Sequence, residues 1–353
     1  MPAFNKTLPS SLIYKSLANM IISQEVFSKN LSHNYSSLME GSKVDAGLYG
    51  STKLYYSCDI LRGYNWENDE EAQNLLNIHR PKDPACQALE VNEFKIVPVT
   101  LDQYLTKQAF ATAGAFSQFN SVMLGMVRET KKVWEATRFN AYLGTAETNV
   151  GKQKREISPV EGQNDALTMA EDLASLLVDL KDYSRSYNDY EYLRSYDESD
   201  VIVVWSAKHY NTLKKIDMPV IFHTENLLDE FKQEVLPSKY FGTVNAGEKQ
   251  GLADGTVRSL IDQELQGKYY FAGDSIEEGV TAPAGTTYTE DDTIAYKVIS
   301  KRSIPMLNGF TTQTEFFNPR SLTSTTFLIW GTNTLEYLKN FPMITARFKE
   351  TID

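Results

Sequence analysis

The longest regular pattern in the chain is helical and covers residues 116–144. Apolar residues recur there at steps of three and four positions, the period of one face of an α-helix. At 1.5 Å per residue this helix is about 40 Å long. Ser117 is its expected N-cap and Gly144 its expected end. An apolar stripe of this length needs a long partner surface, for which we expect the β-prone run at 322–338. The residues expected at that contact are Phe119, Met123, Met126, Val133 and Trp134.

Other segments alternate between helical and extended patterns. A second amphipathic helix is predicted at residues 164–182, where leucines follow helical spacing. A buried-strand pattern at 200–205, DVIVVW, leads directly into a short helix. Branched and aromatic residues predict strands at the end of the chain, over residues 294–302, 322–338 and 343–349. This mixture, without an internal repeat, predicts an α+β fold class. The alternative for the long helix, taken alone, is an ordinary core helix of an α/β enzyme.

A long extended excursion is predicted near the start of the chain. β-prone runs at residues 52–64 and 88–101 flank a polar tip that is too long for a tight hairpin turn. Loops of this length with little structure of their own are often functional. Tyr64 and Trp66 lie near the tip, and such amphipathic aromatics serve as interface anchors. Whether they contact another molecule or pack on their own hairpin stays open.

Composition describes a globular protein without an obvious ligand. Of the 353 residues, 42% are hydrophobic and 23% are charged, which is ordinary for a globular domain. The formal net charge of −11 argues against a dedicated nucleic-acid binder. The two cysteines, Cys58 and Cys86, form neither a CxxC motif nor a disulfide framework, so a reducing compartment is expected. No apolar run is long enough to span a bilayer, and no signal-peptide pattern opens the sequence. We therefore expect a cytosolic product with no membrane partner.

A search for chemistry yields no catalytic, cofactor-binding or metal-ligating residue. The four histidines are scattered, without the spacing that a metal site requires. The GxSxG motif, the Walker phosphate loop and the GxGxxG motif are absent. Acidic clusters at residues 69–71 and 290–292 could ligate a hard cation, but adjacent loop carboxylates are more often solvated. The sequence therefore predicts no enzyme and no cofactor, and its many segments without a core of their own indicate assembly.

Two stretches carry a resemblance to a known family. Residues 101–145, LDQYLTKQAFATAGAFSQFNSVMLGMVRETKKVWEATRFNAYLGT, resemble the lead-in and spine helix of the major capsid proteins of tailed bacteriophages, particularly short-tailed ones. Residues 201–217, VIVVWSAKHYNTLKKID, resemble the strand-then-helix step of the axial domain in the same family. The order of elements along nearly the whole chain is similar to that of the family, whose fold is the Hong Kong 97 capsid fold.

The resemblance implies a division of the chain into regions. The first are an N-terminal arm and an extended loop, the family's E-loop. A peripheral domain carries the spine helix and receives strands from later in the chain. An axial domain also receives the C-terminal strand. The implied boundaries are 1–50 for the arm, 51–97 for the loop, 98–160 and 308–340 for the peripheral domain, and 161–307 and 341–353 for the axial domain.

The resemblance also implies a function. A protein of this family would assemble into hexamers and pentamers of an icosahedral phage head that encloses double-stranded DNA, after assembly in the host cytoplasm. No long charged helical segment precedes the arm, so a separate scaffolding protein is expected, together with a portal. Whether decoration proteins also bind is left open by the sequence. Two alternatives remain at this point. One is the shell of a bacterial nanocompartment with the same fold, and the other is an enzyme with an unrecognised site.

A shell around packed DNA must contact its phosphates without binding them tightly, because each neutralised phosphate adds affinity. The predicted long helix carries four basic residues against Glu129 and Glu135. We expect its polar face to look toward the genome, with the acidic excess of the chain on the outside. The alternative is that these basic residues pair with Glu129, Glu135 or acids of a neighbour. The residues concerned are Arg128, Lys131, Lys132 and Arg138.

Overall fold

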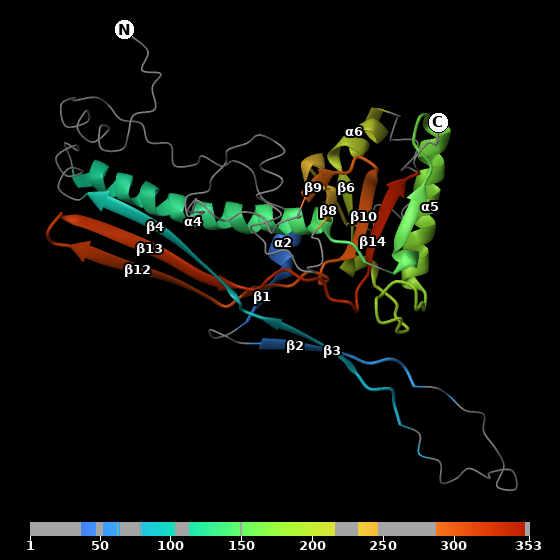
Figure 1. Ribbon diagram of the computed structural model, residues 1–353. Coiled ribbons are helices and arrows are strands. Elements are labelled where there is room, and N and C mark those ends of the chain that lie inside the picture. Colours follow the sequence, from blue (N-terminus) through green and yellow to red (C-terminus); the bar gives the residue numbers. More distant parts are fainter. Residues whose placement is uncertain are drawn as a thin grey trace, which may run out of the picture.

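A computed structural model of the chain describes residues 37–46, 52–61, 63, 78, 80–102, 113–148, 150–215, 232–245 and 287–349. Three parts are visible in Figure 1. A long helix with three strands beside it forms one end, a compact body of sheet and helices forms the other, and a two-stranded ribbon lies below the place where they join. Most of the expected N-terminal arm lies outside the described residues.

The long helix, α4, spans Ala113–Thr145 and has 33 residues. It begins before the expected N-cap Ser117, which therefore lies inside the helix. Gly144 is also inside, in the last turn, and the structure gives a reason for a glycine there. A Cβ atom at Gly144 would lie 1.9 Å from the carbonyl oxygen of Tyr240, in the short 3-10 helix η3 (Ser238–Tyr240). Close approach of two backbones thus requires the residue without a side chain.

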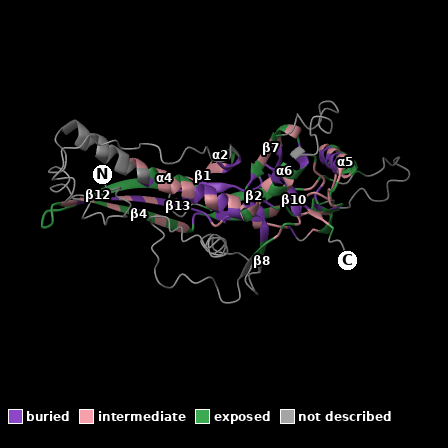
Figure 2. Cartoon of the chain, turned by 90° about the horizontal axis from the view of Figure 1, so that it is seen from above, coloured by how far each residue is buried: buried purple, intermediate pink, exposed green. Residues whose placement is uncertain are grey.

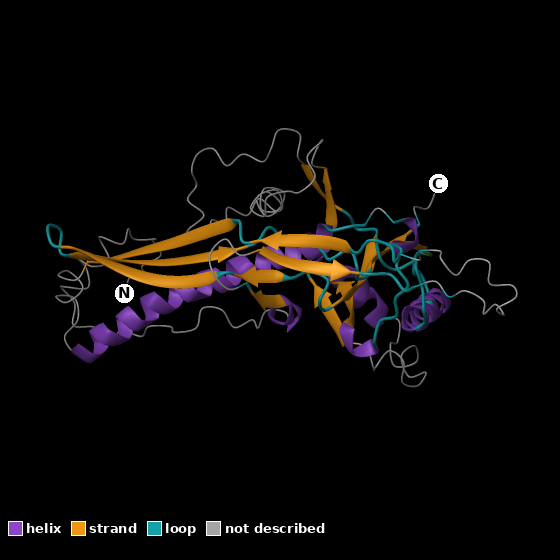
Figure 3. Cartoon of the chain, turned by 90° about the horizontal axis from the view of Figure 1, so that it is seen from below, coloured by secondary structure: helices purple, strands orange, loops and turns teal. Residues whose placement is uncertain are grey.

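Three antiparallel strands run alongside α4 (Figure 3), in the order β12-β13-β4. One face of this sheet packs on the helix, because Val97, Leu328 and Trp330 form a buried cluster with Val127 and Trp134. The two tryptophan rings meet edge to face at 5.6 Å. Alternate strand residues therefore point toward α4 and away from it. The three strands are β4 (Glu93–Asp102), β12 (Phe310–Asn318) and β13 (Thr323–Thr332).

Three expectations about these strands need correction. The returning run of the extended loop is two strands, β3 (Ala85–Glu90) and β4, and only β4 joins the sheet beside α4. β4 is continuous across the boundary expected at residue 97. β13 stops at Thr332 and not at residue 338, because the buried Asn333 side chain bonds the backbone of Leu307 (2.7 Å). The strand pattern did not single out the exposed, threonine-rich β12, although the resemblance assigned residues 308–340 to strands of the peripheral domain.

The compact body is built on a five-stranded mixed sheet, in the order β5-β14-β10-β6-β7. The predicted helix at residues 164–182 is confirmed as α5 (Gln163–Lys181), whose leucines pack on this sheet. The predicted strand and helix after residue 200 are confirmed as β6 (Val201–Ser206) and α6 (Ala207–Lys215). The structure places β5 in this sheet, although it precedes the boundary expected at residue 160. The other strands are β5 (Lys154–Ile157), β7 (Lys232–Leu236), β10 (Ile294–Ser300) and β14 (Met343–Phe348).

Short elements fill the space between the two ends. The helix α2 (Ser37–Ser42) buries Leu38 and Met39 in the cluster that also holds Phe139 and Leu143 of α4. The other short elements are β1 (Lys43–Asp45), which pairs with β11 (Met306–Asn308), β8 (Gly242–Asn245), which pairs with β9 (Thr287–Glu290), and the 3-10 helices η1 (Gly151–Gln153) and η2 (Glu198–Asp200).

A buried lysine joins the end of α4 to the central strand of the body. Lys297, in β10, is fully buried, and its Nζ donates to the carbonyl oxygen of Ala146 (2.7 Å), just past the helix. Burial lowers the pKa of this amine to about 7, against the opposing field of Glu147. Arg347 pairs with both Glu147 and Asp291 at the same place. The joint between helix and body is therefore polar and buried.

We predict that Trp134→Ala destabilises the unassembled subunit by about 3–5 kcal/mol, because it leaves a large cavity between α4 and the sheet. Urea-induced unfolding measures this difference. Lys132→Ala, at an exposed position on the same helix, is the matched control and should change the free energy of unfolding by less than about 0.5 kcal/mol. Equal effects of the two substitutions would contradict the packing described here.

Lys297 gives a pH-dependent prediction. The ordinary pKa of a lysine is 10.5, whereas that of Lys297 in the folded chain is about 7. Between pH 7 and pH 10.5 the unfolded state therefore binds more protons than the folded state. The wild type should therefore gain stability relative to Lys297→Met as the pH rises from 7 to 10, by at most about 1.4 kcal/mol per pH unit. Urea unfolding of both proteins at a series of pH values tests this. A difference that does not change with pH would refute it.

Candidate functional site: the base of the extended loop

The extended loop leaves the body as a two-stranded ribbon. β2 (Thr52–Ser57) pairs antiparallel with β3, with Leu54 opposite Ala88 and Tyr56 opposite Cys86. One face of the ribbon lies on the body, where Tyr55 and Leu89 join a buried cluster. The other face carries Leu54 and Tyr56, whose residues are 49% and 66% exposed. The ribbon is thus held on one side and presents apolar side chains on the other.

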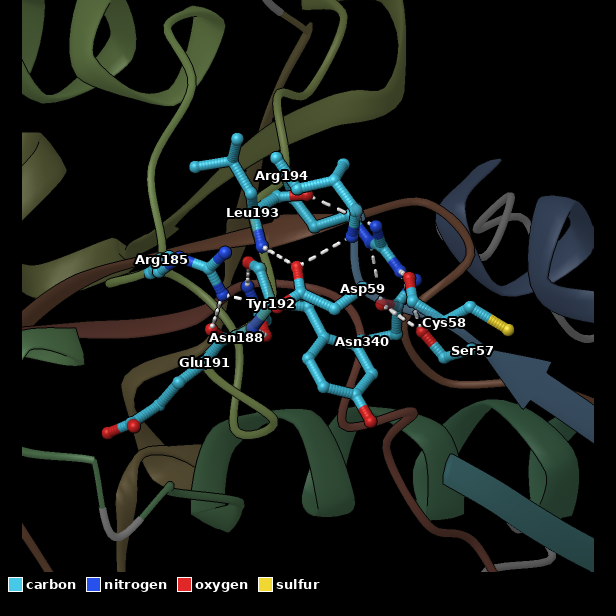
Figure 4. Close-up of polar contacts among 11 residues, drawn as sticks. Ser57, Cys58, Asp59, Arg185, Asn188, Glu191, Tyr192, Leu193, Arg194 and Asn340 are labelled. Atoms are coloured by element: carbon cyan, nitrogen blue, oxygen red, sulfur yellow. Dashed lines mark hydrogen bonds and ion pairs between the residues drawn. The ribbon is translucent and has the colours of Figure 1, made fainter. Parts of the chain in front are cut away.

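Arg194 fastens the end of β2 to the body (Figure 4). One guanidinium nitrogen, Nη2, donates to the hydroxyl of Ser57 (2.9 Å) and to the carbonyl oxygen of Cys58 (2.6 Å). Its Nε donates to Oδ1 of Asn340 (2.9 Å), which also accepts a hydrogen bond from the Ser57 hydroxyl (2.6 Å). Three segments that are far apart in sequence therefore meet at one arginine.

Asp59 makes a second attachment immediately beyond β2. Its Oδ2 accepts from Arg185 (2.5 Å) and its Oδ1 accepts from the backbone nitrogens of Leu193 (3.0 Å) and Ile60 (2.9 Å). The hydrogen bond from Arg185 is the main cause that lowers the pKa of Asp59 to about 2, and the two backbone donors act in the same direction. The carboxylate therefore stays charged and clamped at neutral pH.

The loop that receives Asp59 is ordered by its own polar contacts. The fully buried Asn188 accepts from the backbone nitrogen of Tyr192 (2.9 Å) and donates to the carbonyl oxygen of the same residue (2.7 Å). Ser184 and Arg194 pair as an isolated antiparallel bridge. The helix α5 ends at Lys181, so the tyrosine-rich segment that follows it is not part of the helix. Residues 184–194 thus form an ordered surface to which the base of the ribbon binds.

The contacts at the base of the loop attach one chain segment to another. Within the described ranges no cluster of histidine, cysteine, aspartate or glutamate could hold a metal ion. In the same ranges no helix combines the length and apolar character needed to cross a membrane. What the geometry does is fix the direction in which the extended loop leaves the body.

The profile of a family described as Phi29-like phage major capsid protein matches residues 10–343. The chain belongs to this family. No curated protein matches the sequence. Because the family match covers most of the chain, it favours the viral shell over the cellular nanocompartment and over the enzyme with an unrecognised site.

Solved structures show the same fold. A chain in the capsid structure of Staphylococcus phage Andhra is 13% identical over 94% of this chain and 88% of its own length, with a TM-score of 0.61. A chain in the structure of the head fiber and inner core protein gp22 of native bacteriophage P68 is 13% identical over 98% and 90%, also at 0.61. The capsid of the cyanophage P-SCSP1u gives 9% identity, 94% of both chains and 0.52. The expected phage capsid fold is therefore confirmed.

The structure separates the expected site residues of this capsid protein into three groups. The loop residues Tyr64 and Trp66 lie outside the described residues. On α4, Trp134 is 5% exposed and packs on the sheet, and Val133 is half-buried. The other three expected residues of that helix, Phe119, Met123 and Met126, have side chains that lie outside the described part of the structure.

The expected inner face is wrong for Arg138. This residue is 1% exposed and lies between α4 and the sheet, over the ring of Trp134. Its guanidinium pairs with Glu93 of β4 (3.3 Å) and donates to the carbonyl oxygen of Asn333. A charged side chain is buried here because the Glu93 carboxylate, the Asn333 carbonyl oxygen and the Thr332 hydroxyl (3.4 Å) converge on it. It cannot face a packaged genome.

The other three basic residues of the helix also differ among themselves. Lys131 pairs with Glu135 (3.5 Å) and donates to the hydroxyl of Thr311 (2.7 Å). The pairing alternative is therefore confirmed for this lysine. Arg128 and Lys132 are exposed, so only these two retain the expected inward role as a proposal.

We predict that Asp59→Asn lowers the melting temperature of the capsid protein at pH 6, because the amide cannot form the ion pair with Arg185. The carboxylate's folded pKa is depressed, so its contribution is present above the ordinary value of 3.8 and disappears as the pH falls through about 2. The difference between wild type and variant should shrink over that interval. Asp83→Asn, at an exposed position on the same loop, is the matched control. A pH-independent difference would count against the clamp.

Proposed function

We propose that this phage major capsid protein forms hexamers and pentamers of a closed icosahedral head that encloses double-stranded DNA. The observation that carries the proposal is the ribbon of the extended loop. Its base is fixed by Arg194 and Asp59, while its outer face exposes Leu54 and Tyr56. Among the described residues nothing of its own chain covers that face. A ribbon with a fixed base and an apolar outer face is suited to contact with a neighbouring subunit.

The extended loop is the principal contact between subunits in this proposal. Ile60 and Leu61 on its outgoing arm are 57% and 73% exposed, and Ile78 on its return is 79% exposed. Exposed apolar side chains in one region mark an interaction surface. Tyr64 and Trp66 belong to the same excursion and act as aromatic anchors against the neighbour. The fixed base converts this apolar arm into an oriented one, which reduces the ordering cost of assembly.

The proposed partners follow from the same function. A separate scaffolding protein directs assembly in the host cytoplasm, a portal occupies one vertex, and decoration proteins are possible outside. DNA is contacted without sequence specificity. Two exposed basic residues of α4, Arg128 and Lys132, supply the positive charge toward it, and the net charge of −11 keeps that contact weak. No enzymatic step, cofactor or membrane partner is part of the proposal.

We predict that a capsid protein with residues 64–84 replaced by a short Gly-Ser linker folds but does not form shells. The clamp residues Arg194 and Asp59 and both ribbon strands remain, so the body should keep its circular dichroism spectrum and its cooperative unfolding. Negative-stain imaging after co-expression with the scaffolding protein measures shell formation.

A second variant separates loop loss from surface loss. Leu54→Ser combined with Tyr56→Ser keeps the whole loop and removes only the apolar outer face of the ribbon. It should also reduce shell yield, whereas Val178→Ser, at an exposed apolar residue of α5, should not. Normal particles from the linker variant would refute the role given to the loop.

A further inference from the structure

Among the described residues, no segment pairs with the outer edge of strand β12 in the sheet beside α4. Its two outer strands are β12 and β4. β12 has nine residues, which pair with β13 without any register shift, and every residue from 311 to 318 is exposed. In Figure 2 exposed residues lie along this strand and the turn at its end. Such an edge presents a row of backbone donors and acceptors to any other strand.

The remaining long edges in the described ranges carry features that hinder pairing. β4 contains Pro98 and Lys95, and proline cannot donate to a ladder. The edge strands of the body are shorter and more charged, with Lys154, Arg155 and Glu156 in β5 and two charges in β7. β12 has no proline or lysine, and its one charge is Glu315. The ribbon strand β3 has no proline or lysine either, but it has only six residues, so β12 is the longest edge in the described ranges with so little protection.

We propose that β12 pairs antiparallel with β12 of a second copy of this chain across a two-fold axis. The inference rests on the proposed function, because a shell must join its rings of subunits to one another as well as close each ring. A two-fold contact uses the same patch on both copies. Pairing of the two edges makes one continuous six-stranded sheet from two three-stranded ones and removes both exposed edges.

The two sides of a shell restrict the register of this pair. Opposite residues in a sheet share a face. Centring the two-fold on a residue therefore keeps both α4 helices on the same side of the joined sheet, as an inside and an outside require. Centring it on Glu315 would set two carboxylates directly opposite each other, which is destabilising. That register is excluded.

The register centred on Gln313 is the most complementary. It sets Phe316 of one copy opposite Phe310 of the other, and aromatic cross-strand pairs are favourable. It also sets Glu315 opposite Thr311 of the second copy. The hydroxyl of Thr311 is held by Lys131 of its own chain (2.7 Å), so the carboxylate meets a lysine across the axis. Phe310, Phe316 and Glu315 of β12 thus each have a favourable partner in this register.

Cysteine cross-linking tests the register. In a background with Cys58→Ser and Cys86→Ser, Gln313→Cys should form a disulfide dimer in assembled shells, because opposite Cβ atoms in paired strands lie near disulfide distance. Thr100→Cys, exposed on the other edge strand, should not. A mixture of Glu315→Cys and Thr311→Cys chains should cross-link, whereas each alone should not. Shells that form normally without the Gln313→Cys dimer would overturn the pairing and leave the proposed function intact.

Charge exchange tests the two-fold itself. Gln313→Lys alone should lose the contact, since it opposes two ammonium groups, and Gln313→Glu alone should lose it in the same way. Co-expression of the two variants should restore shells, because opposite charges then meet at the axis. Failure of the mixture to recover shells that each variant has lost would overturn the proposal. If wild-type chains form no shells, the proposed function fails, and cross-linking of concentrated Gln313→Cys chains in solution still decides the pairing.

Discussion

The contact between α4 and its three-stranded sheet holds the elongated shape of this protein. A helix of 33 residues cannot remain straight and isolated in water on propensity alone. Here Trp134 and Val127 are buried against Val97, Leu328 and Trp330. Arg138 adds a polar contact in the same layer, because it pairs with Glu93 and reaches the backbone after β13. Burial on one face stabilises both the helix and the sheet.

That rigid layer is useful because its end is tied to the compact body. Gly144 lets the last turn of α4 approach the backbone of Tyr240, and Lys297 holds the carbonyl just beyond the helix. The base of the extended loop is fixed to the same body through Arg194 and Asp59. Three projecting surfaces, the helix layer, the body and the ribbon, thus keep defined directions. A shell protein needs such directions, because curvature follows from the angle between contacts.

The chain buries its apolar residues unevenly, and this asymmetry is consistent with its family. The five-stranded sheet is covered on both faces by helices and loops. The ribbon and the face of the three-stranded sheet away from α4 expose Leu54, Tyr56, Phe94, Ile96 and Phe316. A two-layer arrangement that leaves one apolar face open is incomplete in a single chain. In the proposed shell, a neighbouring subunit covers this face.

The local sequence pattern was sufficient to predict a helix or strand wherever one face of that element is buried along its whole length. The helices α4 and α5 and the strand β6 follow from spacing alone, because an amphipathic period or a continuous apolar run forces the choice. The capsid resemblance followed from the order of such elements. The strand pattern did not predict β12, because its exposed threonines give no alternation of apolar and polar residues.

The burial of Arg138, the attachment of Asp59 and the end of β13 depend on contacts between segments that are distant in the sequence. Arg138 reads as a residue of the polar face until Glu93, far away in the chain, neutralises it and lets it be buried. Asp59 reads as a loop residue until Arg185 and the backbone of Leu193 meet it. β13 reads as continuing past Thr332 until the Asn333 side chain captures the backbone of Leu307. The period of apolar residues predicts which face of a helix or strand is buried. It cannot predict which residue of another element will lie against that face, because the two meet only in the folded chain.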